Sequence, residues 1–190
     1  MADAAKKILK GLKKIQIFPI TANTATAYTA SAGMLVPGAQ SLTLDPDVSE
    51  WTVNADDEVY DAGADWNGMK LTFQVAELSL ELKSHLEGGT WDETAKEYDY
   101  SSNTVAPEIG LSFAARTSDG EYRMVKLWVL KVTKIKGEYK TKGGSGDSSS
   151  PVSVEATVMS RTIDGKVKRE KDSVGGDLAW LNDLNDTPEV

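Results

Sequence analysis

The sequence contains no cysteine and only one histidine, His85. The absence of cysteine excludes a disulfide framework, a thiolate metal site and a cysteine nucleophile. Zinc sites draw mainly on Cys and His, so a zinc enzyme is not expected, whereas an all-oxygen Ca²⁺ or Mg²⁺ site stays open. His85 lacks a surrounding Ser or Cys motif such as G-x-S-x-G. We therefore expect it to serve as a favourable charge at a helix C-terminus or as a packing residue.

Long hydrophobic runs are also absent. No apolar stretch approaches the roughly 18 to 20 residues that are needed to span a bilayer. The apolar patch at 15–20 is interrupted by Gln16 and Pro19 and is shorter than the about 7 to 15 residues of a signal-peptide core. We therefore expect neither a membrane span nor an export signal, and we expect synthesis inside the cell.

Positive charge is missing from a long part of the chain. Between Ile15 and Met69 there is no Lys or Arg, while the same part contains many acids: Asp45, Asp47, Glu50, Asp56, Asp57, Glu58, Asp61 and Asp65. The stretch 123–142 is the opposite, with a single acid, Glu138, among the cations Arg123, Lys126, Lys131, Lys134, Lys136, Lys140 and Lys142. The net charge of −8 argues against a general attraction to nucleic acid phosphates.

What remains is the composition of an ordinary folded domain. The 190 residues are 40% hydrophobic and 26% charged, which is enough to form one hydrophobic core. We find no internal repeat of 20 to 50 residues that would indicate a solenoid. One domain is therefore expected.

Alternating apolar and polar residues predict several strands. They lie at 14–20, 69–75, 109–113, 122–132, 152–159 and 166–169. The turn signal at 118–120 joins 109–113 to 122–132 as a hairpin. In the second strand of this hairpin both faces carry apolar side chains, one set including Trp128, Leu130 and Val132 and the other Val125, Leu127 and Val129. We therefore expect it to be a central strand, covered on both sides.

The other segments predict one helix and several irregular regions. Ser79 is a suitable N-cap, leucines follow at helical spacing, and Gly88 ends the pattern, so a helix is expected at about 79–87. Residues 39–68 are expected to form a long loop, and 137–150 a flexible one. A mainly β, antiparallel sandwich or barrel at 11–171 follows, with a basic N-terminal arm at 1–10 and an acidic arm at 172–190 that orders on a partner.

No motif in the sequence indicates a catalytic, metal or cofactor site. The Gly/Ser run at 143–150 lacks the order of a phosphate-binding loop, and no helix follows it. Residues 45–50 resemble the acidic spacing of a Ca²⁺ loop, but Glu50 stands where glycine is required. No pair of carboxylates stands out for glycoside hydrolysis. Trp51 and Trp66 lie in the acidic segment, where they indicate a surface that a partner covers or, alternatively, a sugar-stacking surface.

The order of these features resembles a known family. The run Ala-Asp-Asp-Glu-Val-Tyr at 55–60, the strand Gly-Met-Lys-Leu-Thr-Phe-Gln-Val at 68–75 and the helix that follows are similar to the central part of major tail tube proteins of long, non-contractile-tailed bacteriophages of Gram-positive bacteria. Ile-Gly-Leu-Ser-Phe at 109–113, Lys-Leu-Trp at 126–128, the loop at 140–143 and Thr-Ile-Asp-Gly-Lys at 162–166 follow in the same order. Gly-Leu-Lys-Lys-Ile at 11–15 resembles the first strand of that family.

The resemblance implies a non-enzymatic virion protein. Its subunits would form hexameric rings that stack into a hollow tail tube, through which DNA is ejected. It implies contacts with further copies of the chain and with the tape measure protein, the tail terminator and the distal tail protein of the same phage. It also implies a long loop that bridges successive rings. A capsid decoration protein, or a carbohydrate-binding β-sandwich, remains an alternative.

Opposite charges on one chain suit head-to-tail stacking, which needs two different complementary surfaces. We therefore predict that residues 45–66 of one subunit meet residues 131–142 of the next. The predicted contact residues are Trp51, Asp56, Asp57, Glu58, Tyr60, Trp66, Lys134, Lys136, Lys140 and Lys142. The alternative is that both charge runs are simply solvated faces.

Overall fold

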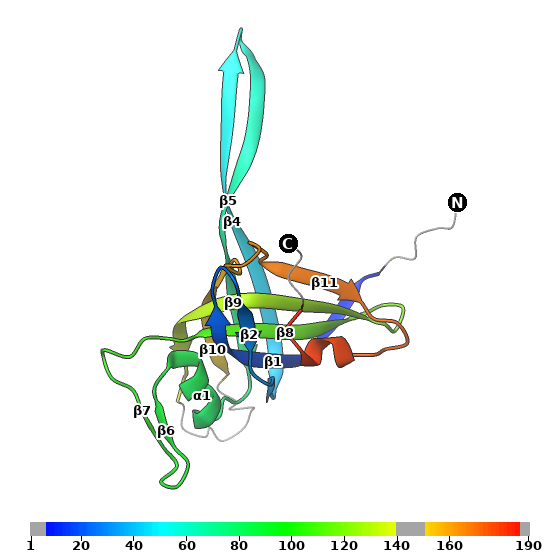
Figure 1. Cartoon of the computed structure of the whole chain (residues 1–190). Helices are drawn as coiled ribbons and strands as arrows, with labels where there is room; N and C mark the ends of the chain where they lie inside the picture. Colours follow the sequence, from blue (N-terminus) through cyan, green and yellow to red (C-terminus); the bar gives the residue numbers. More distant parts are fainter. Residues whose placement is uncertain (1–6, 140–150, 187–190) are drawn as a thin grey trace.

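A computed structural model describes residues 7–139 and 151–186, which form a mainly antiparallel β structure (Figure 1). In this part of the chain the main sheet has nine strands, with the order β2-β1-β8-β9-β10-β5-β4, while β3 pairs with β1 and β11 with β9. The strands are β1 (Leu9–Asn23), β2 (Tyr28–Ala30), β3 (Met34–Val36), β4 (Ala39–Ala55), β5 (Glu58–Val75), β8 (Glu108–Thr117), β9 (Tyr122–Lys136), β10 (Val152–Met159) and β11 (Lys168–Asp172). The remaining elements are the helix α1 (Leu80–Glu87), the small hairpin β6 (Thr90–Asp92) and β7 (Glu97–Asp99), and a 3₁₀ turn, η1 (Ala179–Asn182).

The sheet curls until its two margins are joined. β3 pairs with β1 through Val36 and Ile15, and two residues after β3 the chain enters β4, which pairs with β5. The amide of Ala76 donates to the carbonyl of Gly38 between these two pairings. The short β3–β4 connection therefore links the first strand to the far margin of the sheet and gives a barrel-like body.

The main core fills this body. It includes Ile17 of β1, Phe73 of β5, Leu111 of β8, Leu127 of β9 and Val154 of β10, all at most 1% exposed. Leu82 and Leu86 of α1 belong to the same cluster. Full burial of each such side chain stabilises the fold by about 1.5–3 kcal/mol, so the interior of the curled sheet is the main source of stability.

A second layer covers the outer face of β8 and β9. Leu181 and Leu184, both fully buried, come from the segment that follows β11, and they contact Ala114 and Trp128 respectively in two smaller clusters. The hydroxyl of Ser112 donates to the carbonyl of Leu181 at 2.9 Å. The expectation that 172–190 is an arm ordered only by a partner is therefore wrong for 172–186, while 187–190 lie outside the described residues.

The sequence correctly predicted the other core elements. The hairpin β8–β9, the central position of β9, the strand β10 and the helix are all present. Ser79 caps α1 by accepting a hydrogen bond from the amide of Leu82, and Gly88 ends it with φ 84°. The first strand was expected at 14–20 but is longer. β1 begins at Leu9, within the expected N-terminal arm at 1–10, and ends at Asn23. Residues 1–6, and 140–150 of the predicted flexible loop, lie outside the described residues.

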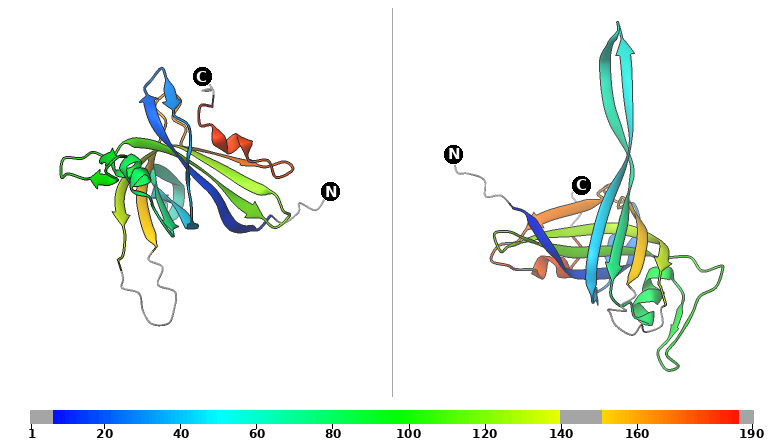
Figure 2. Two further views of the ribbon diagram at one scale, coloured as in Figure 1. Left: turned by 90° about the horizontal axis from the view of Figure 1, so that it is seen from below. Right: turned by 180° about the vertical axis from the view of Figure 1, so that it is seen from behind.

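The largest difference concerns residues 39–68. They were expected to form a long loop, but they are part of two long paired strands, β4 and β5. The first part of each pairing, such as Leu44 with Leu71, belongs to the body. The rest projects from the body as a two-stranded ribbon (Figure 2).

Candidate interaction surfaces

The projecting ribbon, residues 47–68, is the most conspicuous surface feature and is called the arm below. Its strands pair from Asp47 with Gly68 to Ala55 with Glu58. Asp56 and Asp57 close the hairpin, both with positive φ (52° and 66°), which is the conformation of the two central residues in a type I′ turn. The first strand of the arm has nine residues, 47–55, and the second has eleven, 58–68, because the register shifts twice along the pairing. At about 3.3 Å a residue, the nine-residue side makes the arm roughly 30 Å long.

The arm has no core of its own. Every described residue from Asp47 to Asn67 is exposed except Gly63, which is half-buried. The exposed large hydrophobic side chains of the arm are Val48, Trp51, Val53, Val59, Tyr60 and Trp66, with Tyr60 at 78% and Val59 at 65%. A two-stranded ribbon in water is marginally stable at best, so this amount of exposed apolar surface indicates a contact with something else.

One aromatic side chain of the arm is held in place from within. The ring of Trp51 lies over Gly63, its partner across the ribbon, and a Cβ at position 63 would come within 2.5 Å of Cζ2 of the ring. Trp66 instead lies beside Val48 across the ribbon. The two tryptophans therefore belong to opposite faces, because residues 48 and 51 are separated by an odd number of positions along β4.

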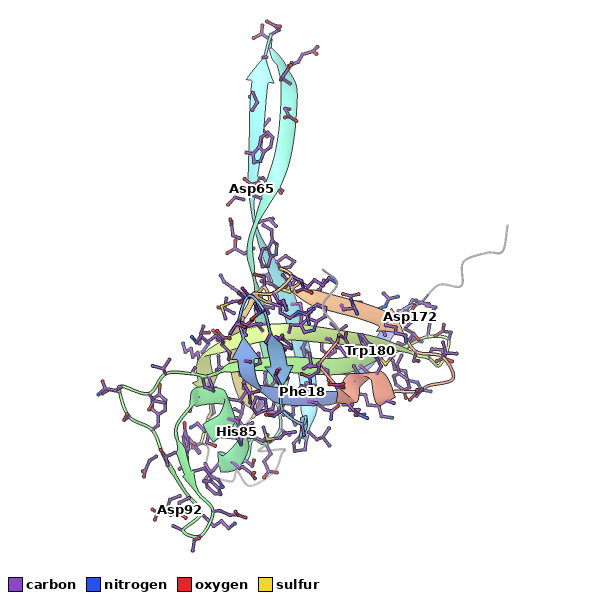
Figure 3. The ribbon with its side chains drawn as sticks, viewed as in Figure 1. Phe18, Asp65, His85, Asp92, Asp172 and Trp180 are labelled. Atoms are coloured by element: carbon purple, nitrogen blue, oxygen red, sulfur yellow. The ribbon has the colours of Figure 1, made fainter. Side chains whose placement is uncertain are left out.

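The arm carries only negative charge. Asp47, Glu50, Asp56, Asp57, Glu58, Asp61 and Asp65 all lie on it, without a Lys or Arg. Figure 3 shows Asp65 on the arm, far from His85 and Asp92 at the opposite end of the molecule. Like charges on one narrow ribbon repel each other, and this repulsion is relieved when a cationic surface meets the arm.

The predicted basic partner surface lies at the other end of the sheet. Lys134 and Lys136 are near the end of β9, and Lys136 is paired with Ser153, which is paired with Gln74 at the end of β5 that is distant from the arm. The ammonium of Lys136 lies 2.5 Å from the carboxylate of Glu155 and holds the pKa of Glu155 below its usual range. Lys140 and Lys142 lie outside the described residues. The structure thus groups Trp51, Asp56, Asp57, Glu58, Tyr60 and Trp66 on the arm and separates them from Lys134 and Lys136.

A third surface was not predicted from the sequence. Between the start of β1 and the body part of β4 there is a hollow of about 450 Å³, called the groove below. Its apolar lining is Leu9, Leu12, Leu42, Leu44, Phe113 and Val125, and the charged side chains at its margin are Arg123 and Glu170. The residues come from β1, β4, β8, β9 and β11, of which only β8 and β9 are consecutive in the sequence, so no local pattern could indicate the groove.

Lysine and arginine side chains lie on the other face of the strands β1 and β8, opposite the groove. Lys10, Lys13 and Arg116 line a hollow that shares Gly11 and Leu12 with the groove. Lys13 is 5.3 Å from the ring centre of Tyr122, whereas neither Lys10 nor Arg116 forms an ion pair with the described part of the chain. The groove itself is lined by one acid, Glu170, and by Arg123, which is paired with Asp172.

Within residues 7–139 and 151–186, no three His, Asp or Glu side chains are grouped as metal ligands would be. The Ca²⁺-like stretch at 45–50 is extended strand within β4 rather than a loop. His85 is half-buried in the last turn of α1.

The strongest buried charges serve the packing of the fold. Arg161 is fully buried and pairs with Asp164, and its guanidinium lies 4.6 Å from the ring centre of Trp128. Lys126, 1% exposed, binds the carboxylate of Asp186 at 2.8 Å and lies 4.1 Å from the ring centre of Trp180. These contacts fasten the segment after β10 to the outer face of β9.

No helix in the described part of the chain has the length and apolar character needed to cross a membrane. No family model matches the sequence, and no curated protein is detectably similar to it.

Proposed function

We propose that this protein is a structural subunit of a bacteriophage virion, the major subunit of a tail tube. Copies would form hexameric rings, and the rings would stack into a hollow tube through which DNA is ejected. In this proposal the chain has no catalytic role and acts through contacts with its own copies, and at the ends and inside of the tube with the tail terminator, the distal tail protein and the tape measure protein.

The arm is the observation that carries the proposal. It is a long, regular hairpin with exposed aromatic and aliphatic side chains, yet its residues contribute nothing to the core. A monomeric protein gains no stability from such a ribbon. In a subunit that assembles with its copies, the ribbon would contact a neighbouring subunit at a distance from the body.

The shape of the subunit supports stacking in one direction. The arm leaves one end of the body, while α1, the β6–β7 hairpin and the end of β9 lie toward the other (Figure 1). Contacts between two different surfaces of identical subunits are heterologous and generate rings or filaments. A barrel-like body with a long projecting hairpin is therefore suited to a repeating assembly.

Charge agrees with passage of DNA. The net charge of −8 makes a continuous wall of these subunits repel phosphate groups on average. DNA would then move along the lumen without being held by it.

The test is negative-stain electron microscopy of the purified chain over a range of concentrations, with size-exclusion chromatography of the same samples. The proposal predicts hollow tubes or six-membered rings. A chain that stays monomeric at every concentration and binds a glycan saturably would contradict it and would indicate a carbohydrate-binding module. Association only with preformed capsids would indicate a decoration protein.

A further inference from the structure

We infer that a hinge at Asn67 and Gly68 joins the arm to the body, and that a side-chain hydrogen bond from Asn67 to Ser49 holds the arm in its observed direction. The hinge acts within one molecule and does not depend on the proposed function. The arm turns on it as a unit, with its own strand pairing intact.

The strand pairing is interrupted at the base of the arm. Asp47 is paired with Gly68, and the next pair along the arm is Val48 with Trp66. Asn67 therefore has no partner on β4 and forms a one-residue bulge in β5. A bulge bends its strand and increases the local twist, and the ribbon twists sharply where it leaves the body (Figure 2). The direction of the arm is therefore set at this bulge.

Gly68 has a backbone conformation that suits a hinge. Its φ is 152°, in the range that residues with a side chain rarely adopt. A Cβ at position 68 would meet no atom within 4 Å. The position therefore requires glycine for its backbone conformation and not for lack of space. Hinge motions are concentrated at a few residues that absorb the change in φ and ψ, and Gly68 is placed to do so.

Packing changes abruptly across the hinge. On the body side, Met69 is 6% exposed and belongs to the main core. On the arm side, the residues from Asp47 to Asn67 are exposed except for the half-buried Gly63. Among the described residues, no side-chain hydrogen bond or ion pair joins the arm to the body. The arm therefore has no packing beyond the hinge that would fix its direction.

One side-chain contact lies within the hinge itself. The amide Nδ2 of Asn67 donates to Oγ of Ser49 across the ribbon, at 2.6 Å. This hydrogen bond ties the bulged residue of β5 to β4 on the arm side of the bulge. A single neutral hydrogen bond contributes only modestly to stability. It therefore favours one direction of the arm and still allows the arm to turn.

The absence of cysteine from the chain allows pairs of spin labels to be placed for distance measurements by pulsed electron paramagnetic resonance. One pair, Glu58→Cys with Arg116→Cys, joins the arm tip to an exposed position on β8 of the body. A second pair, Glu50→Cys with Glu58→Cys, lies entirely within the arm. Labelled chains are diluted with unlabelled ones, so that each distance is measured within one molecule, and circular dichroism confirms that every variant is folded.

Asn67→Ala and Ser49→Ala each remove one end of the hydrogen bond, and Asn54→Ala, at an exposed asparagine near the arm tip, is the matched control. Loss of the bond should raise the population of turned arms about fivefold. The distribution of distances from arm to body then broadens, while that within the arm is unchanged and the control alters neither. Equal arm-to-body distributions in all three variants would overturn the hinge, and so would equal broadening within the arm, which indicates fraying.

Gly68→Ala tests the backbone of the hinge. Alanine rarely adopts the φ of 152° that is observed at this position, so the bulge must take another shape. The mean distance from the arm tip to β8 should therefore shift, while the distance within the arm stays the same. An unchanged mean distance from the arm tip to β8 would overturn the role of Gly68.

Discussion

The ammonium of Lys126 and the carboxylate of Asp186 lie 2.8 Å apart, with Lys126 only 1% exposed on β9 and Asp186 near the end of the described chain. This pair, together with Arg169, which also contacts Asp186 at 3.3 Å, fixes the last segment across the outer face of the sheet. An acidic chain end that looks like a loose tail in the sequence is thus part of the folded body.

Replacing Asp186 by Asn should destabilise the fold by about 3 kcal/mol, because it leaves the buried ammonium of Lys126 without its counter-charge. Denaturant unfolding monitored by tryptophan fluorescence would measure the loss. Asp57→Asn at the exposed arm tip is the matched control and should change the free energy of unfolding by no more than about 0.5 kcal/mol. In a Lys126→Met background Asp186→Asn should cost much less, and an equal cost in both backgrounds would show that the pair does not act as a unit.

Asp172 makes the stability dependent on pH in the acid range. Its hydrogen bonds from Arg123 and Lys7 lower the pKa of Asp172 to about 2, compared with about 3.9 in an unfolded chain. The contribution to stability is therefore complete above about pH 4 and is lost as the pH falls to about 2. Asp172→Asn should reduce the slope of unfolding free energy against pH in that window, and an unchanged slope would contradict this role.

Gly63 sets the position of Trp51 on the arm. Gly63→Ala places a Cβ within 2.5 Å of the ring, so the indole must swing away from the ribbon. We expect a shift of the Trp51 indole N–H resonance in NMR spectra, while the free energy of unfolding changes by less than about 0.5 kcal/mol because the arm lies outside the core. Ala62→Ser, on the opposite face of the ribbon, is the control, and a similar indole shift in that variant would show that Trp51 does not depend on Gly63.

Charge reversal on the arm should block assembly without unfolding the subunit. The triple change Glu50→Lys, Glu58→Lys and Asp65→Lys places cations on exposed positions of the acidic arm, which we expect to meet a cationic surface of another copy. Sedimentation velocity should show a loss of polymer at concentrations where the unaltered chain assembles, with an unchanged circular dichroism spectrum. The control applies the same charge change to Glu93, Glu97 and Asp99 on the β6–β7 hairpin. Normal polymers from the arm variant would contradict the electrostatic part of the account.

The sequence was sufficient to predict strands that are buried on one face and helices whose ends carry clear capping residues. The strand at 69–75 and the helix with Ser79 and Gly88 are of this kind. The arm was missed because alternation of apolar and polar residues marks a strand only where one face is buried, and neither face of the arm is buried. Its turn could have been found, since Asp56-Asp57 tolerates positive φ, but the acidic flanks masked the hairpin.

A bulge in β9 breaks the strict alternation of side chains between the two faces of the strand, on which the prediction for 122–132 relied. Ile109 pairs with Leu130 and Leu111 with Leu127, so β9 has one more residue than β8 between these pairs. Leu130 therefore joins Leu127 in the main core, while Trp128 is fully buried on the other face. The groove and the packing of Leu181 and Leu184 were also beyond prediction, because they depend on which distant strands become neighbours.

The most direct measurement of the central claim compares the intact chain with one that lacks the arm. Asp47 and Gly68 are paired at its base, so residues 48–67 can be replaced by Asn-Gly, which forms a two-residue hairpin turn. Both proteins are examined by circular dichroism, thermal unfolding and negative-stain electron microscopy at matched concentrations. We predict that both fold with similar unfolding temperatures, that the intact chain forms hollow tubes and that the shortened chain forms none. Tubes of the same diameter and length from the shortened chain would contradict the account.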